Sequence, residues 1–411
     1  MERTDHTRFA AIAVDLSPLR QSRDFRILFA AQAVSLTGSE ITYVAIPFQA
    51  YALTHSSLIV GLASFMELIP VLLVALVGGA LADALDRKRM VRMSEVGLCV
   101  ASALLLVNAL LPHPQISVLV VGVMLAAGFD ALQRPSLDAL VPRIVSRDKL
   151  TAAAALEGLR GNLGMVIAPP IAGVLIAFAG LPFTYGIDVG TFAVSLLLLS
   201  LLKPVPPPPD ARLSLSSALS GLRYALRRQH LLGSYLIDIN AMFFGMPMAL
   251  FPQIAQSLDG PVVLGALYTA PSAGSLLATV SSGWSGRVRH HGRAIAIAAA
   301  VWGMAIIAFG FASSLWIALI ALAIAGAADM ISGVFRSTLW NQSIPDAMRG
   351  RMAGVEMISY TSGPALGDLE AGVVAALAGL RVSIVSGGAL CVAGTIALCA
   401  LLPRFWNYRA D

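Results

Sequence analysis

The stretch Gly78–Met90, GGALADALDRKRM, separates two long apolar segments of this sequence. A nearly unbroken apolar run ends on its two glycines, and a second apolar run begins at Met90. Two aspartates and three consecutive bases lie between them. A polar, basic turn between two such segments predicts a pair of helices that cross a bilayer and turn back in water.

The composition of the whole chain agrees with this local pattern. Of the 411 residues, 57% are hydrophobic and only 12% are charged, and the mean hydropathy is +0.79. A soluble domain carries roughly 25% charged residues, so this chain lacks the polar groups that a water-facing surface of its size needs. In a bilayer every backbone polar group must be satisfied internally, which favours helices. The composition therefore predicts an all-α integral membrane protein.

Apolar segments long enough to cross a bilayer, about 20 residues each, recur twelve times along the chain. They lie at residues 25–53, 57–83, 90–111, 116–141, 151–179, 182–202, 230–257, 262–287, 293–312, 315–341, 350–378 and 380–402. We therefore expect twelve transmembrane helices.

The positions of the bases predict the orientation of these helices. Of the 28 Lys and Arg residues, Arg134, Arg160 and Arg336 fall inside segments, and Arg381 alone lies in or beside a loop that joins an odd segment to the next even one. The others lie in the tails, in the even-to-odd loops or at segment ends adjoining them. Since cytoplasmic loops carry the excess of bases, both termini are expected in the cytoplasm, with the protein in the cell (inner) membrane. The net charge of +5 follows from this bias, so we expect no nucleic-acid partner.

The longest hydrophilic stretch, residues 203–229, follows the sixth segment and divides the chain into two halves. We expect a bundle of six helices in residues 1–202, a cytoplasmic loop with an amphipathic helix in 203–229, and a second six-helix bundle in 230–411. Similar features recur at a near-constant offset: Arg134 and Arg336 lie 202 residues apart, and Pro142 and Pro345 lie 203 apart. Two pseudo-symmetric bundles with substrate between them form a transporter architecture.

Three motifs resemble a known family. The stretch GGALADALDRKRM is similar to the signature loop between helices 2 and 3 of the major facilitator superfamily. The stretch GNLGMVIAPPIAG, residues 161–173, resembles that superfamily's antiporter signature on helix 5. The four prolines at 206–209 and the Phe25–Arg26 pair are similar to its bacterial exporter branch, which includes enterobactin-type siderophore exporters and macrolide or multidrug efflux proteins. This resemblance implies transport by alternating access.

Ionisable residues inside the apolar segments are the candidate proton-coupling or substrate-binding groups, because a charge at bilayer depth needs a partner, water or a proton. Glu40 and Glu67 are expected at similar depth on neighbouring helices. Glu40 is the preferred proton carrier because the resemblance places its helix beside the central cavity. Asp130, Arg134, Asp238, Asp329 and Arg336 complete the set.

Two interpretations of these charges remain open. Asp130 and Arg134 lie four residues apart and Asp329 and Arg336 seven apart, so each pair shares a helix face. Each pair is either a fixed ion pair that holds helices together or part of the transport path. Arg134 and Arg336 would attract an anionic substrate such as a catecholate, or belong to a cytoplasmic gate.

The resemblance also implies gating residues. In the loop after the second segment these are Gly79, Asp83 and Arg87, with Asp83 contacting the start of the eleventh helix around 349–354. In the fifth segment they are Gly164 and Pro169. The alternative, purely structural role of the glycines is to allow close helix packing.

No GxxxxGK[ST] sequence occurs, so the chain has no P-loop for ATP. We therefore expect a secondary transporter, and specifically a proton-coupled antiporter that exports amphipathic small molecules, either drugs or a siderophore. The alternatives are a uniporter or importer on the same fold, or a non-transporting membrane sensor or enzyme. We expect no enzymatic activity, cofactor or metal, and a monomer whose partners are a small-molecule substrate, protons and the lipid bilayer.

Overall fold

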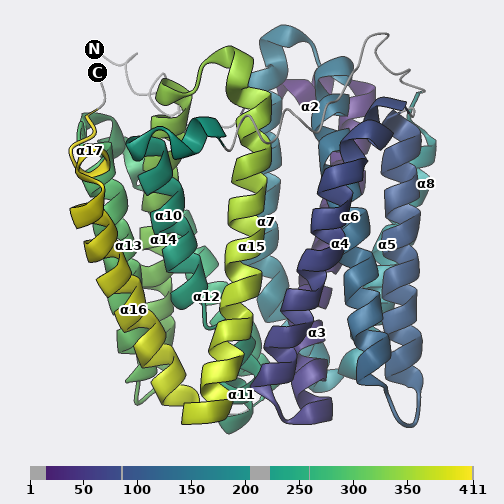
Figure 1. The fold of residues 1–411 in the computed structure, drawn as a ribbon. Helices are drawn as coiled ribbons and strands as arrows, with labels where there is room; N and C mark the ends of the chain where they lie inside the picture. The colour runs from purple at the N-terminus through teal and green to yellow at the C-terminus, as the bar shows by residue number, and fades with distance from the viewer. Residues whose placement is uncertain (1–14, 85–86, 204–222, 259, 410–411) are drawn as a thin grey trace, which may run out of the picture.

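The structure, a computed structural model, describes residues 15–84, 87–203, 223–258 and 260–409. The side chains of 75–84, of 139 and of several residues between 346 and 358 lie outside this description. The described chain is helical, and all long helices run roughly parallel to one axis (Figure 1). The helices of the first half are α2 Ser17–Gln21, α3 Arg23–Thr54, α4 Ser57–Ala84, α5 Arg87–Leu110, α6 Ile116–Ile144, α7 Leu150–Phe178 and α8 Gly180–Ser200. Those of the second half are α10 Gln229–Phe244, α11 Phe251–Ser257, α12 Pro261–Val280, α13 His291–Gly310, α14 Leu315–Ser343, α15 Asp346–Ala378, α16 Leu380–Leu401 and α17 Pro403–Trp406.

Twelve spans are present, as the sequence predicts. Within the described residues, ten helical segments are long and apolar enough to cross a membrane. The other two spans are α3 and α15, of 32 and 33 residues. Both carry several charged residues, which lower their hydropathy, and both are packed within the bundle.

Two spans differ from the prediction. The seventh is not one helix, because α10 ends at Phe244 and the chain resumes through the short 3-10 turn Met248–Leu250 into α11. Pro247 between them has no backbone N–H to continue the helical ladder. The eighth span ends at Val280 rather than 287, where a second 3-10 turn, Ser282–Arg287, takes over.

The two halves pack as separate bundles that meet along two seams. Within the first half, α3 packs on α7 and α8, and α5 on α6 and α8; within the second, α14 packs on α12 and α13. Between the halves, α4 packs on α15 and α7 packs on α12. Exchange of the halves converts one seam into the other, as a parallel repeat requires.

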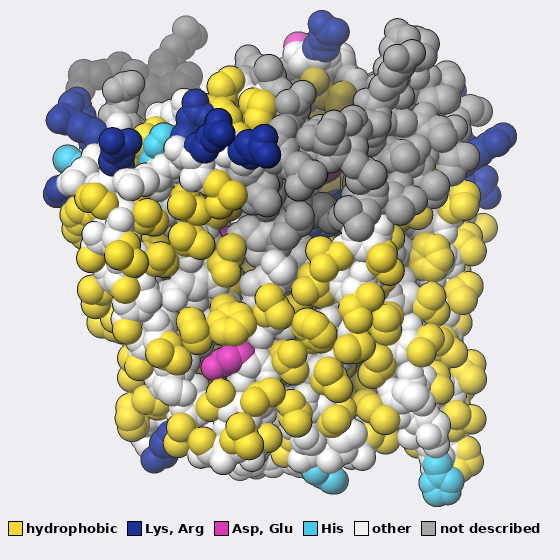
Figure 2. Space-filling view, viewed as in Figure 1, with side chains coloured by type: hydrophobic (Ala, Val, Ile, Leu, Met, Phe, Trp, Pro, Cys, Tyr) yellow, Lys and Arg dark blue, Asp and Glu magenta, His cyan; other side chains and the backbone are white. Residues whose placement is uncertain are grey.

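One end of the bundle, which we call the basic end, carries the start of α3 at Arg23, the start of α5 at Arg87 and the end of α16. The opposite, distal end carries Thr54, Ser57 and Gly379. The described chain begins at Asp15 and ends at Arg409, both at the basic end (Figure 1). In Figure 2 the Lys and Arg side chains gather mainly at this end, and apolar side chains cover the middle of the face shown.

Glycines bring the two seams into close contact at the distal end. A Cβ added to Gly61 of α4 would overlap the carbonyl oxygen of Asp368 on α15, and one on Gly372 of α15 would lie 2.7 Å from the carbonyl oxygen of Ser57. On the other seam, a Cβ on Gly265 of α12 would lie 2.5 Å from the Pro169 carbonyl oxygen. The halves are therefore closed against each other at this end, where α4 and α15 converge in Figure 1.

Candidate functional site

The first cluster of charges lies midway along the first half. Arg134 Nε and Asp130 Oδ2 are 2.8 Å apart on one face of α6, as the four-residue spacing predicts. Both charges act electrostatically on Glu40 of α3. Arg134 also hydrogen-bonds Tyr360 of α15, in the opposite half. The cluster therefore faces the second bundle, although 58% of the Arg134 side chain remains exposed.

Gly164 supports this cluster from α7. A Cβ added there would lie 3.2 Å from Leu36 Cδ2 and 3.8 Å from Glu40 Cγ, so the glycine allows α7 to approach α3 beside Glu40. Pro169, one turn further on, lies on the α7–α12 seam, where its carbonyl oxygen faces Gly265. Both positions predicted to act in gating thus lie where helices approach closely.

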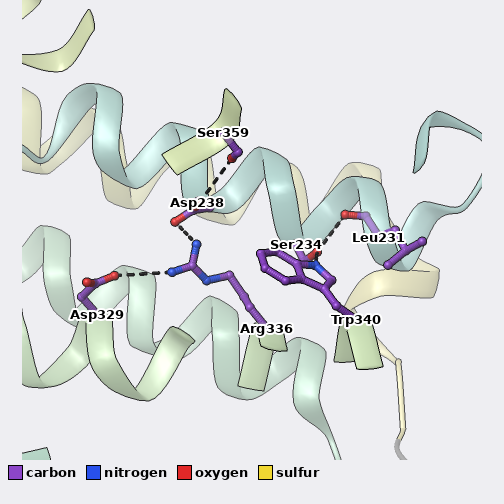
Figure 3. Close-up of polar contacts among 7 residues, drawn as sticks. All are labelled: Leu231, Ser234, Asp238, Asp329, Arg336, Trp340 and Ser359. Carbon is purple, nitrogen blue, oxygen red and sulfur yellow. Dashed lines mark hydrogen bonds and ion pairs between the residues drawn. The ribbon is translucent and has the colours of Figure 1, made fainter. Parts of the chain in front are cut away.

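The second cluster lies inside the second half (Figure 3). The Arg336 guanidinium of α14 forms an ion pair with Asp238 of α10, and its Nη2 lies 3.6 Å from Asp329 Oδ1. Ser359 of α15 donates a hydrogen bond to Asp238 Oδ2 at 3.4 Å. One helical turn along α14, Trp340 Nε1 donates to Ser234 Oγ at 2.9 Å. Two carboxylates, from α10 and α14, thus flank one guanidinium, and Ser359 of α15 supports one of them.

The two arginines related by the repeat therefore have different environments. The Arg134 side chain is 58% exposed and its ion pair lies within its own helix, whereas the Arg336 side chain is 13% exposed and that of Asp238 only 5% exposed. The sequence predicted the Asp329–Arg336 neighbourhood, but it did not predict the pair with Asp238, which depends on how α10 and α14 are rotated.

A third site with acidic residues is a cavity between the two halves, on the distal side of the bundle where α4 packs on α15. We call this region the distal seam. It has a volume of about 30 Å³ and is lined by Tyr43, Ile46, Pro47, Val60, Ala63, Ser64, Glu67, Ala249, Tyr268 and Asp368. Glu67 faces it from α4 and Asp368 from α15. Glu40 is not among its lining residues, so the carboxylate that shares a site with Glu67 is Asp368, to which the sequence analysis gave no role.

Two further buried carboxylates lie inside the first bundle. Glu95 of α5 is fully buried and accepts hydrogen bonds from Gln133 and Ser195. Asp188 of α8 accepts from Thr42 Oγ1 at 2.7 Å and from Ser102 Oγ at 2.6 Å. Sequence reasoning missed Glu95, although a lone Glu inside the apolar segment 90–111 was the signal that would have found it.

The predicted latch around Asp83 lies outside the side chains that the structure describes. The backbone of Gly79 and Asp83 belongs to α4, but their side chains, and most of 349–354, lie outside the described residues. Arg87 begins α5 and is 9% exposed.

Twelve spans in two repeated bundles, with one charged cluster in contact with the opposite half, define the architecture of a membrane transporter. The family model described as transmembrane secretion effector matches residues 13–408. The chain belongs to this family of the major facilitator superfamily. It is therefore a multi-pass membrane transporter and not an enzyme.

Curated relatives support this assignment over nearly the full length. The chain is 30% identical over 404 residues to the enterobactin exporter EntS of Citrobacter koseri, and 29% identical to that of Shigella boydii serotype 4. Each alignment covers 95% of this chain and 95% of the relative.

Solved structures share the fold at low sequence identity. A POT family transporter in complex with 5-aminolevulinic acid superposes with a TM-score of 0.75 at 12% identity, over 93% of this chain and 97% of that one. The nucleoside transporter NupG gives 0.71 at 13% identity, over 92% and 99%. The human organic anion transporter MFSD10 gives 0.64 at 16%, over 92% and 99%.

Proposed function

We propose that this transporter is a proton-coupled antiporter that exports an amphipathic small molecule. The observation that carries the proposal is the cluster of Glu40, Asp130 and Arg134, which faces Tyr360 across the two halves. A half-buried carboxyl between an acid and a base changes its proton affinity when either neighbour moves. Motion of α15 relative to α6 alters the Arg134–Tyr360 contact, and this links the protonation of Glu40 to conformation.

The direction and the substrate class rest on the relatives. Those with 29–30% identity are named as enterobactin exporters, which supports export of a siderophore-like molecule. Arg134, exposed toward the space between the halves, suits the acidic oxygens of a catecholate.

The positive-inside rule supports the orientation that we propose for the protein in the membrane. We place the basic end, with both termini, in the cytoplasm of a cell whose inner membrane holds the protein as a monomer. Residues 1–202 and 230–411 then rock as two bodies about the α4–α15 and α7–α12 seams, linked by 203–229. In this assignment the distal end faces outward and the structure is closed to the outside.

Transport into inverted membrane vesicles tests the proposal. In such vesicles an exporter carries substrate inward, and an imposed acidic interior drives proton antiport. We expect uptake of a catecholate siderophore or an amphipathic drug to rise with the gradient and to fall when a protonophore collapses it. Uptake that is equal with and without the gradient would show a uniporter, and loss of preloaded substrate under the same gradient would show an importer.

Replacement of Glu40 by Gln should remove the response to the gradient. The amide keeps the shape of the side chain but cannot release a proton. Typical coupling free energies correspond to an increase of about 5- to 150-fold in substrate uptake with the gradient. We expect this increase to disappear in the variant while substrate binding remains. Uptake is measured in inverted vesicles, and binding by ligand-induced fluorescence quenching.

Glu157→Gln serves as the matched control, because this half-buried carboxyl on α7 lies outside the clusters described above. Its gradient response should equal that of the wild type. A full response in Glu40→Gln would exclude Glu40 as the proton carrier and direct attention to Asp130 or Asp238.

A further inference from the structure

The cavity at the distal seam combines features that the proposed transport site does not use. Its carboxylates come from opposite halves of the molecule, Glu67 from α4 and Asp368 from α15. Of its lining residues, none is Lys or Arg. Asp368 and Asp130 both act electrostatically on Glu67. Two carboxylates without a base in a low-dielectric site need a cation or a proton.

Asp368 is buried but has hydrogen-bond donors directed at its carboxylate. It is 9% exposed, and its Oδ1 accepts the backbone N–H of Ala249 at 2.9 Å. The hydroxyl of Ser64 donates a second hydrogen bond to it from α4. Donors directed at a carboxylate favour its charged form. These donors offset part of the cost of burying the charge, so Asp368 can be ionised beside Glu67 when a cation occupies the cavity.

The cavity has both the room and the free ligand atoms for a guest. A volume of about 30 Å³ exceeds the roughly 10–15 Å³ that one water-sized sphere occupies. Tyr268 lines it while only 6% exposed. Among the described residues, no hydrogen bond is found for its hydroxyl or for the Glu67 carboxylate. If two carboxyl groups merely shared a proton, they would need neither the space nor a free phenol oxygen.

We infer that this cavity binds a small monovalent cation between Glu67 and Asp368, with the hydroxyl oxygen of Tyr268 as a further ligand. The guest is an alkali metal ion or a primary ammonium group, because both are water-sized and both prefer oxygen ligands. The rings of Tyr43 and Tyr268 pack edge to face beside the cavity, with their centroids 5.7 Å apart. The break in span 7 just before Ala249 resembles the interrupted helices that form ion sites in other transporters.

Because its ligands come from both halves, the bound cation holds the distal seam closed. A ligand that binds one conformation better shifts the population toward it. The seam must separate before the transporter opens at the distal end, and the cation must leave first. This site is independent of Glu40 and does not depend on proton antiport.

Thermal unfolding of the purified protein in lipid nanodiscs tests the site. Measurements at pH 8 compare NaCl, KCl and methylammonium chloride with the chloride of N-methyl-D-glucamine, a cation too large for the cavity, at equal ionic strength. We expect at least one small cation to raise the unfolding midpoint by about 3 °C or more, saturably. A response to Na⁺ or K⁺ alone identifies a metal ion, and one to methylammonium alone identifies an ammonium group.

Three variants separate the cation site from other effects. Glu67→Gln should abolish the shift, Asp368→Asn should abolish or strongly reduce it, and Glu40→Gln should retain it in full. The proposal is overturned if small cations act no differently from N-methyl-D-glucamine, or if the shift survives in Glu67→Gln. It is also overturned if lowering the pH raises the midpoint while no cation does, since the pair then holds only a proton.

Discussion

Replacement of Arg336 by Ala destabilises the second bundle by about 3–5 kcal/mol, the range measured when one partner of a buried ion pair is removed. The reason is the environment of Asp238, whose side chain is 5% exposed. Without the guanidinium, the remaining described partner of Asp238 is the 3.4 Å hydrogen bond from Ser359. A buried carboxylate with that single donor is not adequately solvated. Unfolding of the purified variant in detergent, followed by intrinsic tryptophan fluorescence, measures the loss.

The repeat supplies a matched control. Arg134→Ala removes the arginine at the equivalent place in the first half, but its pair with Asp130 is about half exposed and within one helix. Exposed pairs contribute about 0–1 kcal/mol, so this variant should unfold close to the wild type. The double variant Arg336→Met, Asp238→Leu should recover most of the lost stability, since it leaves no buried charge. If it is as unstable as Arg336→Ala, the arginine acts by packing and not by neutralising Asp238.

The difference between these arginines shows what the sequence can and cannot reveal. The Asp130–Arg134 pair follows from a four-residue spacing on one helix, so it was predictable. The Arg336–Asp238 pair joins residues about a hundred positions apart, and its existence depends on the rotation of two helices about their own axes. Hydropathy fixes where a helix lies in the chain, not which face it turns toward a neighbour.

The same reasoning applies to the span boundaries and to the distal cavity. Apolar length predicted the twelve spans well. The break at Gly245–Pro247 was missed because apolar residues continue on both sides of it. Depth along the helices suggested Glu40 as the neighbour of Glu67. Asp368 reaches the same depth on α15, from the other half, and only the packing of α4 on α15 shows that it shares the cavity.

Replacement of Gly61 by Val prevents the distal end from closing and strongly reduces transport. A Cβ at this position would overlap the Asp368 carbonyl oxygen and lie 2.8 Å from its carbonyl carbon and 3.0 Å from Leu369 Cα. These are backbone atoms, so no rotamer change relieves the contact, and α4 and α15 must separate. Overpacking of this kind costs about 1–3 kcal/mol, which shifts the closed-to-open ratio by about 5- to 150-fold.

Spin labels at His113→Cys and Leu377→Cys, exposed distal positions on the two halves, report this change in a background without Cys99, Cys391 and Cys399. The distance distribution measured by electron paramagnetic resonance should move to longer values in Gly61→Val. Gly161→Val on α7, where an added Cβ meets nothing within 4 Å, should leave it unchanged.

Gly265→Val should lengthen the distance as well, because its Cβ would press on the Pro169 carbonyl of the second seam. Wild-type distances in both seam variants would mean that the glycine contacts do not close the distal end. If only Gly265→Val gives a longer distance, the α7–α12 seam alone closes the distal end. The contact between α4 and α15 is then not required for closure.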